Sequence, residues 1–193
     1  MFADFRKAFD SIEWEFLFQT LRKFNFGENF RKWIKILYTD PCAVIKNNGH
    51  ISDEFMLTRG VRQGCPVSAL LFILCVEVMA CHIRQNADII GLNLDSIGNK
   101  NIKITQYADD AALFVQDAEE MKEAVRCLSL FGEMSGAQLN LNKCEGLWLG
   151  SFKHLQNNCS LLNIKWPIDP IRYLGVFIGH DSAKCYKLNF QNK

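Results

Sequence analysis

Hydrophobic residues recur along this chain in short runs, and their spacing predicts an ordered series of strands and helices. An apolar run ends at Phe5, and residues 12–24 then repeat at helical spacing. Asp10-Ser11 precedes that repeat, so we expect it to cap the helix. Residues 30–38 predict a second helix that ends before Asp40-Pro41. The beginning of the chain is therefore predicted to run strand, turn, helix, helix.

The next stretch predicts a hairpin followed by a central helix. Residues 43–46 and 54–58 have strand-like patterns and are joined through Asn47-Asn48-Gly49, whose residues accept positive φ. Pro66 suits the first turn of a helix, and residues 69–84 are apolar enough for a helix buried on most of its surface.

The remaining residues add strands around one more helix. That helix is expected from Ala118 to Met134, closed by Gly136. Strands are expected at 89–94, 102–107, 111–115, 137–141, 146–149 and 171–178, the first two around the turn Ser96-Ile97-Gly98-Asn99. The mixture predicts an α+β domain with a mostly antiparallel sheet and helices packed on one face.

Composition restricts the function classes. The 193 residues are 49% hydrophobic and 22% charged, as in one globular domain. The longest apolar run, 65–80, contains Pro66, Ser68 and Glu77, which argues against a membrane span. The first residues lack the apolar core of a secretory signal. We therefore expect an intracellular protein, nuclear or cytoplasmic, that is not secreted and has no membrane partner.

Cysteines and net charge change this picture little. The eight cysteines include no C-x-x-C pair, so buried reduced thiols are favoured over disulfides or a zinc site; they are Cys42, Cys65, Cys75, Cys81, Cys127, Cys144, Cys159 and Cys185. The net charge of +1 means that any surface for nucleic acid must be local or partly missing.

Candidate chemistry begins with two adjacent carboxylates in an apolar hairpin. Asp109 and Asp110 interrupt the run IKITQYADDAALFV, where neighbouring like charges repel unless a cation compensates them. Asp4 follows a short strand, and a strand-end carboxylate facing such a pair could hold two divalent cations for phosphoryl transfer. The alternatives are an ordinary acidic surface turn and, for Asp4, a capping residue.

These residues carry a resemblance to the reverse transcriptases of non-LTR retrotransposons, the long-interspersed-element type. DFRKAFDSIEW resembles the first palm motif of that family, and RGVRQGCPVSALLF the second. QYADDAALF, with its YADD sequence, resembles the third motif, SGAQLNLNKCEGLWLG the lysine-bearing fourth, and RYLGVFIG the primer grip. The order and spacing of the motifs make the resemblance specific. It implies a polymerase palm and RNA-directed DNA polymerase activity, which is a nucleotidyltransferase reaction.

The resemblance also assigns the catalytic groups. Asp4, Asp109 and Asp110 would hold two Mg²⁺ ions, for which Mn²⁺ could substitute, and Lys143 would protonate the leaving pyrophosphate. Phe9 would lie under the sugar of the incoming dNTP and exclude a 2′-hydroxyl. Taken alone, Phe9 could equally be a core residue and Lys143 an ordinary surface lysine.

Further residues would contact the substrates. Gln63 and Gly64 would meet the nucleotide and its template base, and Arg62, like Arg59, either contacts phosphate or is solvated surface charge. Tyr173, Leu174 and Gly175 would form the turn that holds the primer end, although this tripeptide alone could belong to any strand.

The resemblance also implies how the domain is organised, and other functions remain as alternatives. We expect a palm over residues 1–180, with a fingers-side hairpin at about 42–60, and a tail, 181–193, leading toward a thumb. The fingers and thumb would belong to a longer parent chain, with an RNA template and a DNA primer as partners, so the 193 residues alone should polymerise little. The alternative is an inactive retrotransposon remnant that at most binds nucleic acid. An RNA-templated RNA polymerase would favour a polar residue at Phe9, and a nucleotide cyclase would not need the Gln63-Gly64 turn.

Overall fold

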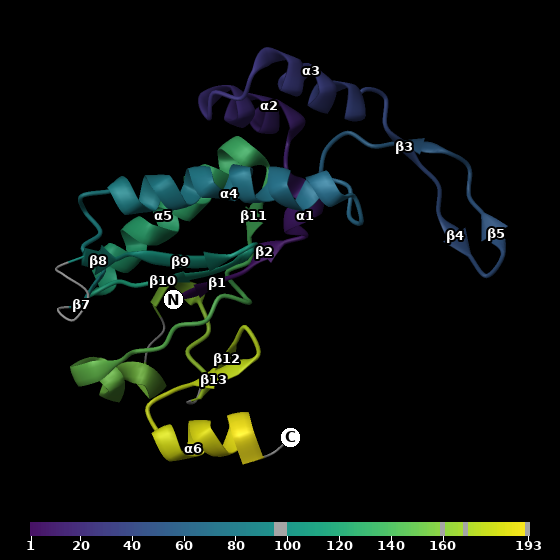
Figure 1. Cartoon of the computed structure of the whole chain (residues 1–193). Coiled ribbons are helices and arrows are strands. Elements are labelled where there is room, and N and C mark those ends of the chain that lie inside the picture. The colour runs from purple at the N-terminus through teal and green to yellow at the C-terminus, as the bar shows by residue number, and fades with distance from the viewer. Residues whose placement is uncertain (95–99, 159–160, 168–169, 192–193) are drawn as a thin grey trace. The chain divides into compact units, whose positions relative to one another are not determined.

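The computed structural model describes residues 1–94, 100–158, 161–167 and 170–191, and the elements are labelled in Figure 1. The chain divides into two units. Unit 1 consists of Met1–Phe5, Ala80–Ser129 and Leu139–Lys193, and unit 2 of Arg6–Met79 and Leu130–Gln138. The chain passes from one unit to the other within four elements: β2 (Phe5–Arg6), α4 (Pro66–Gln85), α5 (Ala118–Ser135) and β11 (Gln138–Leu139).

Unit 1 is built on a three-stranded antiparallel sheet in the order β1-β10-β9. The strands are β1 (Phe2–Ala3), β10 (Asp110–Leu113) and β9 (Ile104–Tyr107). Successive residues of β10 from Ala111 to Leu113 are all buried, so this strand is covered on both faces. Small alanines in β10 pair with β1, Phe2 opposite Ala112 and Ala3 opposite Ala111.

Unit 1 also contains two hairpins and several short helical pieces. Two hairpins pair antiparallel, β7 (Leu92–Leu94) with β8 (Lys100–Ile102) and β12 (Ile171–Tyr173) with β13 (Val176–Ile178). The helical pieces are η2 (Gly150–Asn158), η3 (Leu161–Asn163), α6 (Ser182–Tyr186) and η4 (Lys187–Gln191).

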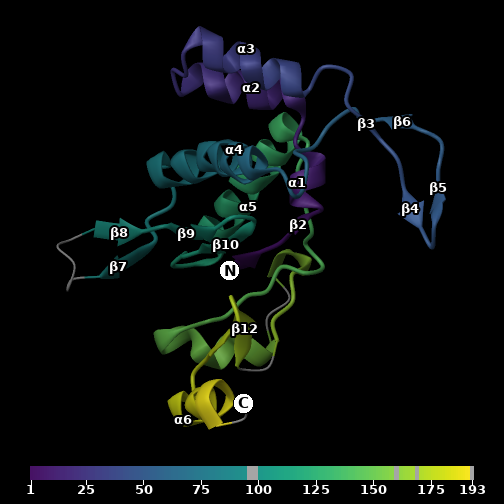
Figure 2. The same ribbon diagram turned by 45° about the vertical axis from the view of Figure 1, so that its right-hand side comes forward.

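Unit 2 begins with three helices, α1 (Ala8–Ser11), α2 (Trp14–Lys23) and α3 (Glu28–Leu37). α2 and α3 lie side by side in Figures 1 and 2. Leu17 and Leu21 are buried and lie four residues apart, on one face of α2, and Ile34 is buried on α3.

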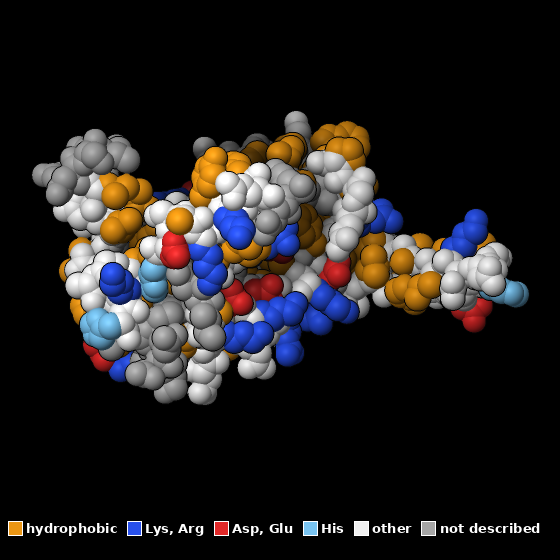
Figure 3. Space-filling view, turned by 90° about the horizontal axis from the view of Figure 1, so that it is seen from below, with side chains coloured by type: hydrophobic (Ala, Val, Ile, Leu, Met, Phe, Trp, Pro, Cys, Tyr) orange, Lys and Arg blue, Asp and Glu red, His pale blue; other side chains and the backbone are white. Residues whose placement is uncertain are grey.

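A hairpin arm extends from the end of α3. Its inner pair is β3 (Cys42–Ala43) with β6 (Phe55–Met56), and its outer pair is β4 (Lys46–Asn47) with β5 (His50–Ile51). The predicted turn is confirmed, because Asn48 and Gly49 both have positive φ, 46° and 84°. Apolar side chains of the arm are exposed, and Figure 3 shows them along the projection at its right, with charged groups toward the end.

Helix α4 begins at Pro66, as predicted. Less of it is buried than its composition suggested, since Leu70 is 64% and Ile73 49% exposed. By length and composition α4 could also cross a membrane, but the core helix of a soluble protein passes the same test.

The α+β prediction is confirmed: the described residues form six α-helices and several small antiparallel sheets. Three local predictions are wrong. Asp10 and Ser11 lie inside α1 instead of capping α2, because Lys7 adopts a left-handed conformation and starts an extra helical turn. Residues 146–149 and 89–90 are not strands, and the predicted turn at 96–99 lies outside the described residues.

The seven cysteines within the described part of the chain form no disulfide bond. Three of them are buried as predicted, namely Cys75, Cys127 and Cys144, while the other four are partly exposed.

Candidate active site

The register of the unit 1 sheet brings the acidic residues to one end. β1 and β10 pair through Ala3 and Ala111, so the next step of the same register sets Asp4 opposite Asp110. Asp110 in turn pairs with Tyr107 of β9, which leaves a two-residue turn of Ala108 and Asp109. Ala108 has φ 54°, a left-handed conformation that such tight turns require. The three predicted carboxylates therefore lie at the same end of this sheet, where the charges of Asp4 and Asp109 act on Asp110.

The electrostatics of this end are unfavourable without a cation. Oδ2 of Asp4 is buried and accepts no hydrogen bond from the described residues. The pKa of Asp110 is raised, first by burial and then by the negative charges of Asp109 and Asp4. A divalent cation would relieve both effects, so the residues present fit one. The side chains are not arranged as metal ligands in this structure: among the described residues, no group of three or more His, Cys, Asp or Glu could hold a metal ion.

Lys143 lies in a turn attached to Asp4. The N–H of Asn140 donates to the carbonyl oxygen of Asp4 at 2.8 Å, and the N–H of Lys143 donates to that of Asn140 at 2.8 Å. The Lys143 side chain is exposed. The backbone thus holds the lysine-bearing turn against the strand that carries Asp4.

Tyr173 contacts the same sheet end from the β12–β13 hairpin. Its hydroxyl donates a long hydrogen bond, 3.4 Å, to the carbonyl oxygen of Asp110, and its ring lies 4.7 Å from that of Phe2. Burial, followed by the charge of Asp110, raises the pKa of Tyr173. Leu174 and Gly175 form the tight turn between the strands, both with positive φ.

A cavity of about 610 Å³ lies beside Tyr173 within unit 1. Its walls are largely apolar and include Phe2, Phe152 and the stacked rings of Trp148 and Trp166, whose centroids are 5.3 Å apart. Tyr173 and Phe2 therefore have an apolar cavity on one side and the acidic sheet end close by.

The candidate nucleotide contacts lie in unit 2. Phe9 stacks on Phe72 of α4, with ring centroids 4.1 Å apart and an interplanar angle of 17°. The carbonyl oxygen of Phe9 accepts the N–H of Val61 at 2.7 Å. Both the ring and the backbone of Phe9 are thus held in place, and the ring remains half-exposed.

The turn before α4 is fastened to α1. Gln63 Nε2 donates to Asp10 Oδ1 at 3.2 Å, and Gly60 has φ +89°, where an added Cβ would lie 2.8 Å from the carbonyl oxygen of Asp10. Gly64 also has positive φ, +85°, but its surroundings are open. Arg62 is exposed, whereas Arg59 lies 3.6 Å from Glu13 and so has an ion-pair partner within the unit.

Sequence reasoning missed four residues that position these groups: Phe2, Asp10, Asn140 and Cys144. Each acts through a contact distant in the sequence. Asn140, for example, acts through its backbone N–H and C=O groups, so its side-chain type carried no signal for these contacts.

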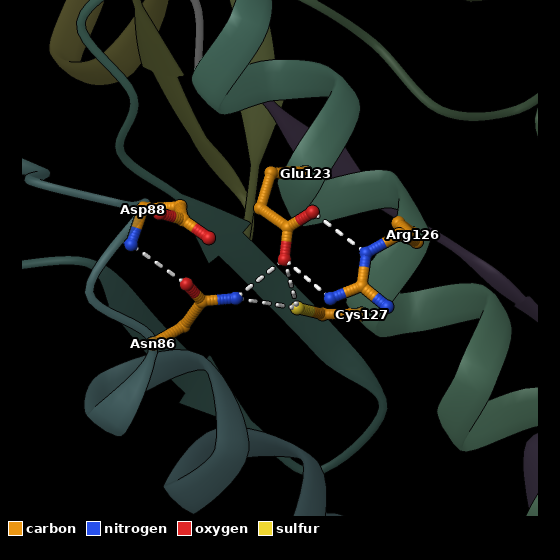
Figure 4. A network of polar contacts seen from close by, with 5 residues as sticks. All are labelled: Asn86, Asp88, Glu123, Arg126 and Cys127. Atoms are coloured by element: carbon orange, nitrogen blue, oxygen red, sulfur yellow. Dashed lines mark hydrogen bonds and ion pairs between the residues drawn. The ribbon is translucent and has the colours of Figure 1, made fainter.

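A second carboxylate in unit 1 has the opposite surroundings. Figure 4 shows Glu123 of α5 between Asn86 and Arg126. Asn86 Nδ2 donates to Glu123 Oε1 at 2.6 Å, and Arg126 donates to both oxygens at 2.7 Å. These bonds, that of Arg126 first, lower the pKa of Glu123 to about 2.

The comparison with protein families decides the identity. The family described as "Reverse transcriptase (RNA-dependent DNA polymerase)" matches residues 1–178. The chain belongs to the reverse transcriptase family. Because this family builds its catalytic domain on a palm, family membership supports the palm assignment of the α+β fold.

The relatives of this reverse transcriptase chain include non-LTR retrotransposon proteins, as expected. It is 33% identical over 96% of its length to the Transposon TX1 uncharacterized 149 kDa protein of Xenopus laevis. It is 29% identical over 73% of its length to the Pol polyprotein of the type-2 element R2DM of Drosophila melanogaster, and 24% identical over 93% to that of a type-1 element R2 of Popillia japonica. The chain spans only 14%, 13% and 26% of these proteins.

Proposed function

We propose that this chain is the palm part of an RNA-directed DNA polymerase, which joins a dNTP to the 3′-hydroxyl of a DNA primer paired with an RNA template. The observation that carries the proposal is the sheet register that aligns Asp4 with Asp110 beside the turn of Asp109. A purely structural acidic turn would not need a third carboxylate with a buried, unbonded oxygen.

In this proposal Asp4, Asp109 and Asp110 hold two Mg²⁺ or Mn²⁺ ions after rotation of their side chains. The bound ions would activate the primer hydroxyl and stabilise the leaving oxygen. Lys143, whose ammonium is exposed, donates a proton from Nζ to the leaving pyrophosphate. The Tyr173-Leu174-Gly175 turn orients the primer end, supported by the contacts of Tyr173 with Phe2 and with the Asp110 backbone.

The unit 2 residues recognise the nucleotide. Phe9 excludes a 2′-hydroxyl, because its stack on Phe72 prevents the ring from moving away from an intruding group. Gln63 and Gly64 contact the nucleotide and its template base, Gln63 being held by Asp10 and Gly64 leaving room for close approach. Arg62 contacts phosphate through an exposed guanidinium.

The proposed organisation is a palm over residues 1–180 with its fingers-side hairpin at about 42–60, and a tail at 181–193 leading toward a thumb. Family membership supports the palm, and the hairpin arm supports the fingers-side segment.

The test is primer extension on an RNA template with dNTPs and Mg²⁺. In any protein that includes these residues and extends the primer, Asp109→Asn should reduce extension at least about a hundredfold, because it removes charge from the site of phosphoryl transfer. Asp88→Asn, an exposed aspartate of the same unit, is the matched control and should leave extension unchanged. Equal extension by the wild type and Asp109→Asn would contradict the proposal. Nucleic-acid binding without any aspartate-dependent extension would favour the inactive remnant.

A further inference from the structure

The segment that pairs with the Asp4 strand contains a bulge. Phe2 and Glu145 exchange two backbone hydrogen bonds, 2.7 and 3.0 Å, and Asn140 donates to the carbonyl oxygen of Asp4 at 2.8 Å. Between these two contacts the first segment covers only two steps along the chain, from Phe2 to Asp4. The opposing segment covers five steps, from Glu145 back to Asn140. The extra residues form the turn that carries Lys143. Bulges of this kind redirect a side chain and are frequent beside active sites.

Backbone hydrogen bonds fix the shape of this bulge. The carbonyl oxygen of Asn140 accepts the N–H groups of both Lys143 and Cys144, at 2.8 and 3.1 Å. The carbonyl oxygen of Cys144 accepts the N–H of Lys165 at 2.9 Å. Cys144 is therefore held from both sides, and its side chain is fully buried.

The side chain of Cys144 lies next to the backbone of Asp4. Along a strand, successive residues point their N–H and C=O groups to opposite sides, so Asp4 directs both groups toward the bulge, as Phe2 does. The Asp4 carbonyl oxygen is bonded to Asn140, and the Asp4 N–H faces the bulge that contains the fully buried Cys144 side chain. Burial raises the pKa of the Cys144 thiol, and the backbone amide of Asp4 acts in the opposite direction. The carboxylate oxygen Oδ2 of the same Asp4 has no hydrogen-bond partner within the described chain.

We propose that Cys144 is a positioning residue for Asp4: its sulfur accepts the Asp4 N–H and fills the bulge, so that the Asp4 carboxylate stays aligned with the acidic turn. The same bulge carries Lys143, so one local structure positions both the Asp4 carboxylate and the Lys143 side chain. This inference rests on the proposed function, because it assumes that Asp4 binds a cation.

Three substitutions of Cys144 separate its two contributions, which are to accept the Asp4 N–H and to fill the bulge. Cys144→Ser keeps an acceptor for the Asp4 N–H in a smaller side chain. Cys144→Val keeps an apolar volume but removes the acceptor, and Cys144→Ala removes both. Cys127→Ala is the matched control, because Cys127 is equally buried in unit 1 but contacts Asn86 and Glu123.

The first measurement is Mn²⁺ binding to the 193-residue chain at 10 °C, followed by the electron paramagnetic resonance signal of free Mn²⁺. We expect Cys144→Ala and Cys144→Val to weaken binding about tenfold, as the loss of residues that orient metal ligands does. Cys144→Ser should restore most of the affinity, and Cys127→Ala should leave it unchanged despite a comparable loss of stability.

The second measurement is amide hydrogen exchange of Asp4 without metal. The Asp4 N–H should be protected in the wild type and in Cys144→Ser and should exchange much faster in Cys144→Ala and Cys144→Val, while Ala3 stays protected. Loss of Asp4 protection with unchanged Mn²⁺ affinity would overturn the positioning role, as would unchanged protection in all variants. If the wild type binds no Mn²⁺, or if the Asp109→Asn variant binds Mn²⁺ as tightly as the wild type, the proposed function is overturned together with the positioning role.

Discussion

Unit 1 holds two groups of carboxylates that differ in what surrounds them. At the sheet end, Asp110 lies with Asp4 and Asp109, and their mutual repulsion contributes to its raised pKa. On α5, Glu123 is bonded to Asn86 and Arg126, and its pKa is lowered to about 2 (Figure 4). Within the described residues, Arg126 forms an ion pair with Glu123, whereas no ion pair joins a lysine or arginine to the three aspartates of the sheet end. This contrast is the one expected if Glu123 serves the structure, where its own chain neutralises it, and if Asp110 belongs to the proposed metal site, where a bound cation would neutralise it.

The sharpest test of this comparison exchanges each acid for its amide and measures metal binding. Asp110→Asn should weaken Mn²⁺ binding at least about tenfold, since a ligand charge is lost. Glu123→Gln should change it less than about twofold, because Arg126 already neutralises that carboxylate. The measurement is the rise of the unfolding midpoint during a MnCl₂ titration. Equal losses in both variants would abolish the distinction between the two groups.

A smaller effect is expected on stability at the Glu123 network. Glu123→Gln should lower the free energy of unfolding at pH 7 by about 1 kcal/mol, the usual scale of a hydrogen bond exchanged with water. Because the folded pKa of Glu123 is depressed, its contribution is present above its ordinary pKa of 4.5 and is lost as the pH falls toward about 2. Urea unfolding at pH 7, 4.5 and 3 should therefore show the two proteins converging. A difference that does not depend on pH would contradict the role of the charge.

The smallest effect has the opposite sign. Without metal, Asp110→Asn should raise the free energy of unfolding at pH 7, by less than about 1 kcal/mol because Asp110 is only partly buried and solvent screens its charge. The folded pKa of Asp110 is raised, so its cost is absent below the ordinary pKa and develops as the pH rises through the folded value. Unfolding in EDTA at pH 7 and pH 4 measures this, and the gain should shrink at pH 4. A variant less stable than the wild type at pH 7 would show that Asp110 has a structural partner.

The elements that could be predicted from the sequence are those set by local pattern. The acidic turn was predictable because two aspartates interrupt an apolar run, and β9 and β10 do pair across Ala108 and Asp109. The helix α5 was predictable from its apolar spacing and its closing glycine, Gly136, which has positive φ. In these cases local preference and the fold agree.

The elements that could not be predicted depend on contacts distant in the sequence. Gly146 looked like the start of a strand, but the ring of Trp166 packs against it so closely that a Cβ would lie 2.5 Å from the ring. The capping assignment for Asp10 failed because Lys7 starts an extra helical turn that contains Asp10, and the Asp10 side chain accepts from the distant Gln63. The bulge opposite Asp4 has no local signature at all, since it exists only when residues 140–145 meet the β1 strand. The roles of the candidate residues stay predictions that the experiments above test.

The division of the chain has a consequence for how the protein folds. Unit 1 is assembled from three separated stretches, and the amino group of Met1 donates to the carbonyl oxygen of Leu113, 112 residues away. A pairing of such long range must close a large loop before it gains any contact energy, which slows folding. Unit 2 draws most of its residues from the single stretch Arg6–Met79 and can gain contacts earlier. We therefore expect β1, and with it the place of Asp4, to form late, so that the acidic end is the last part of the molecule to become native.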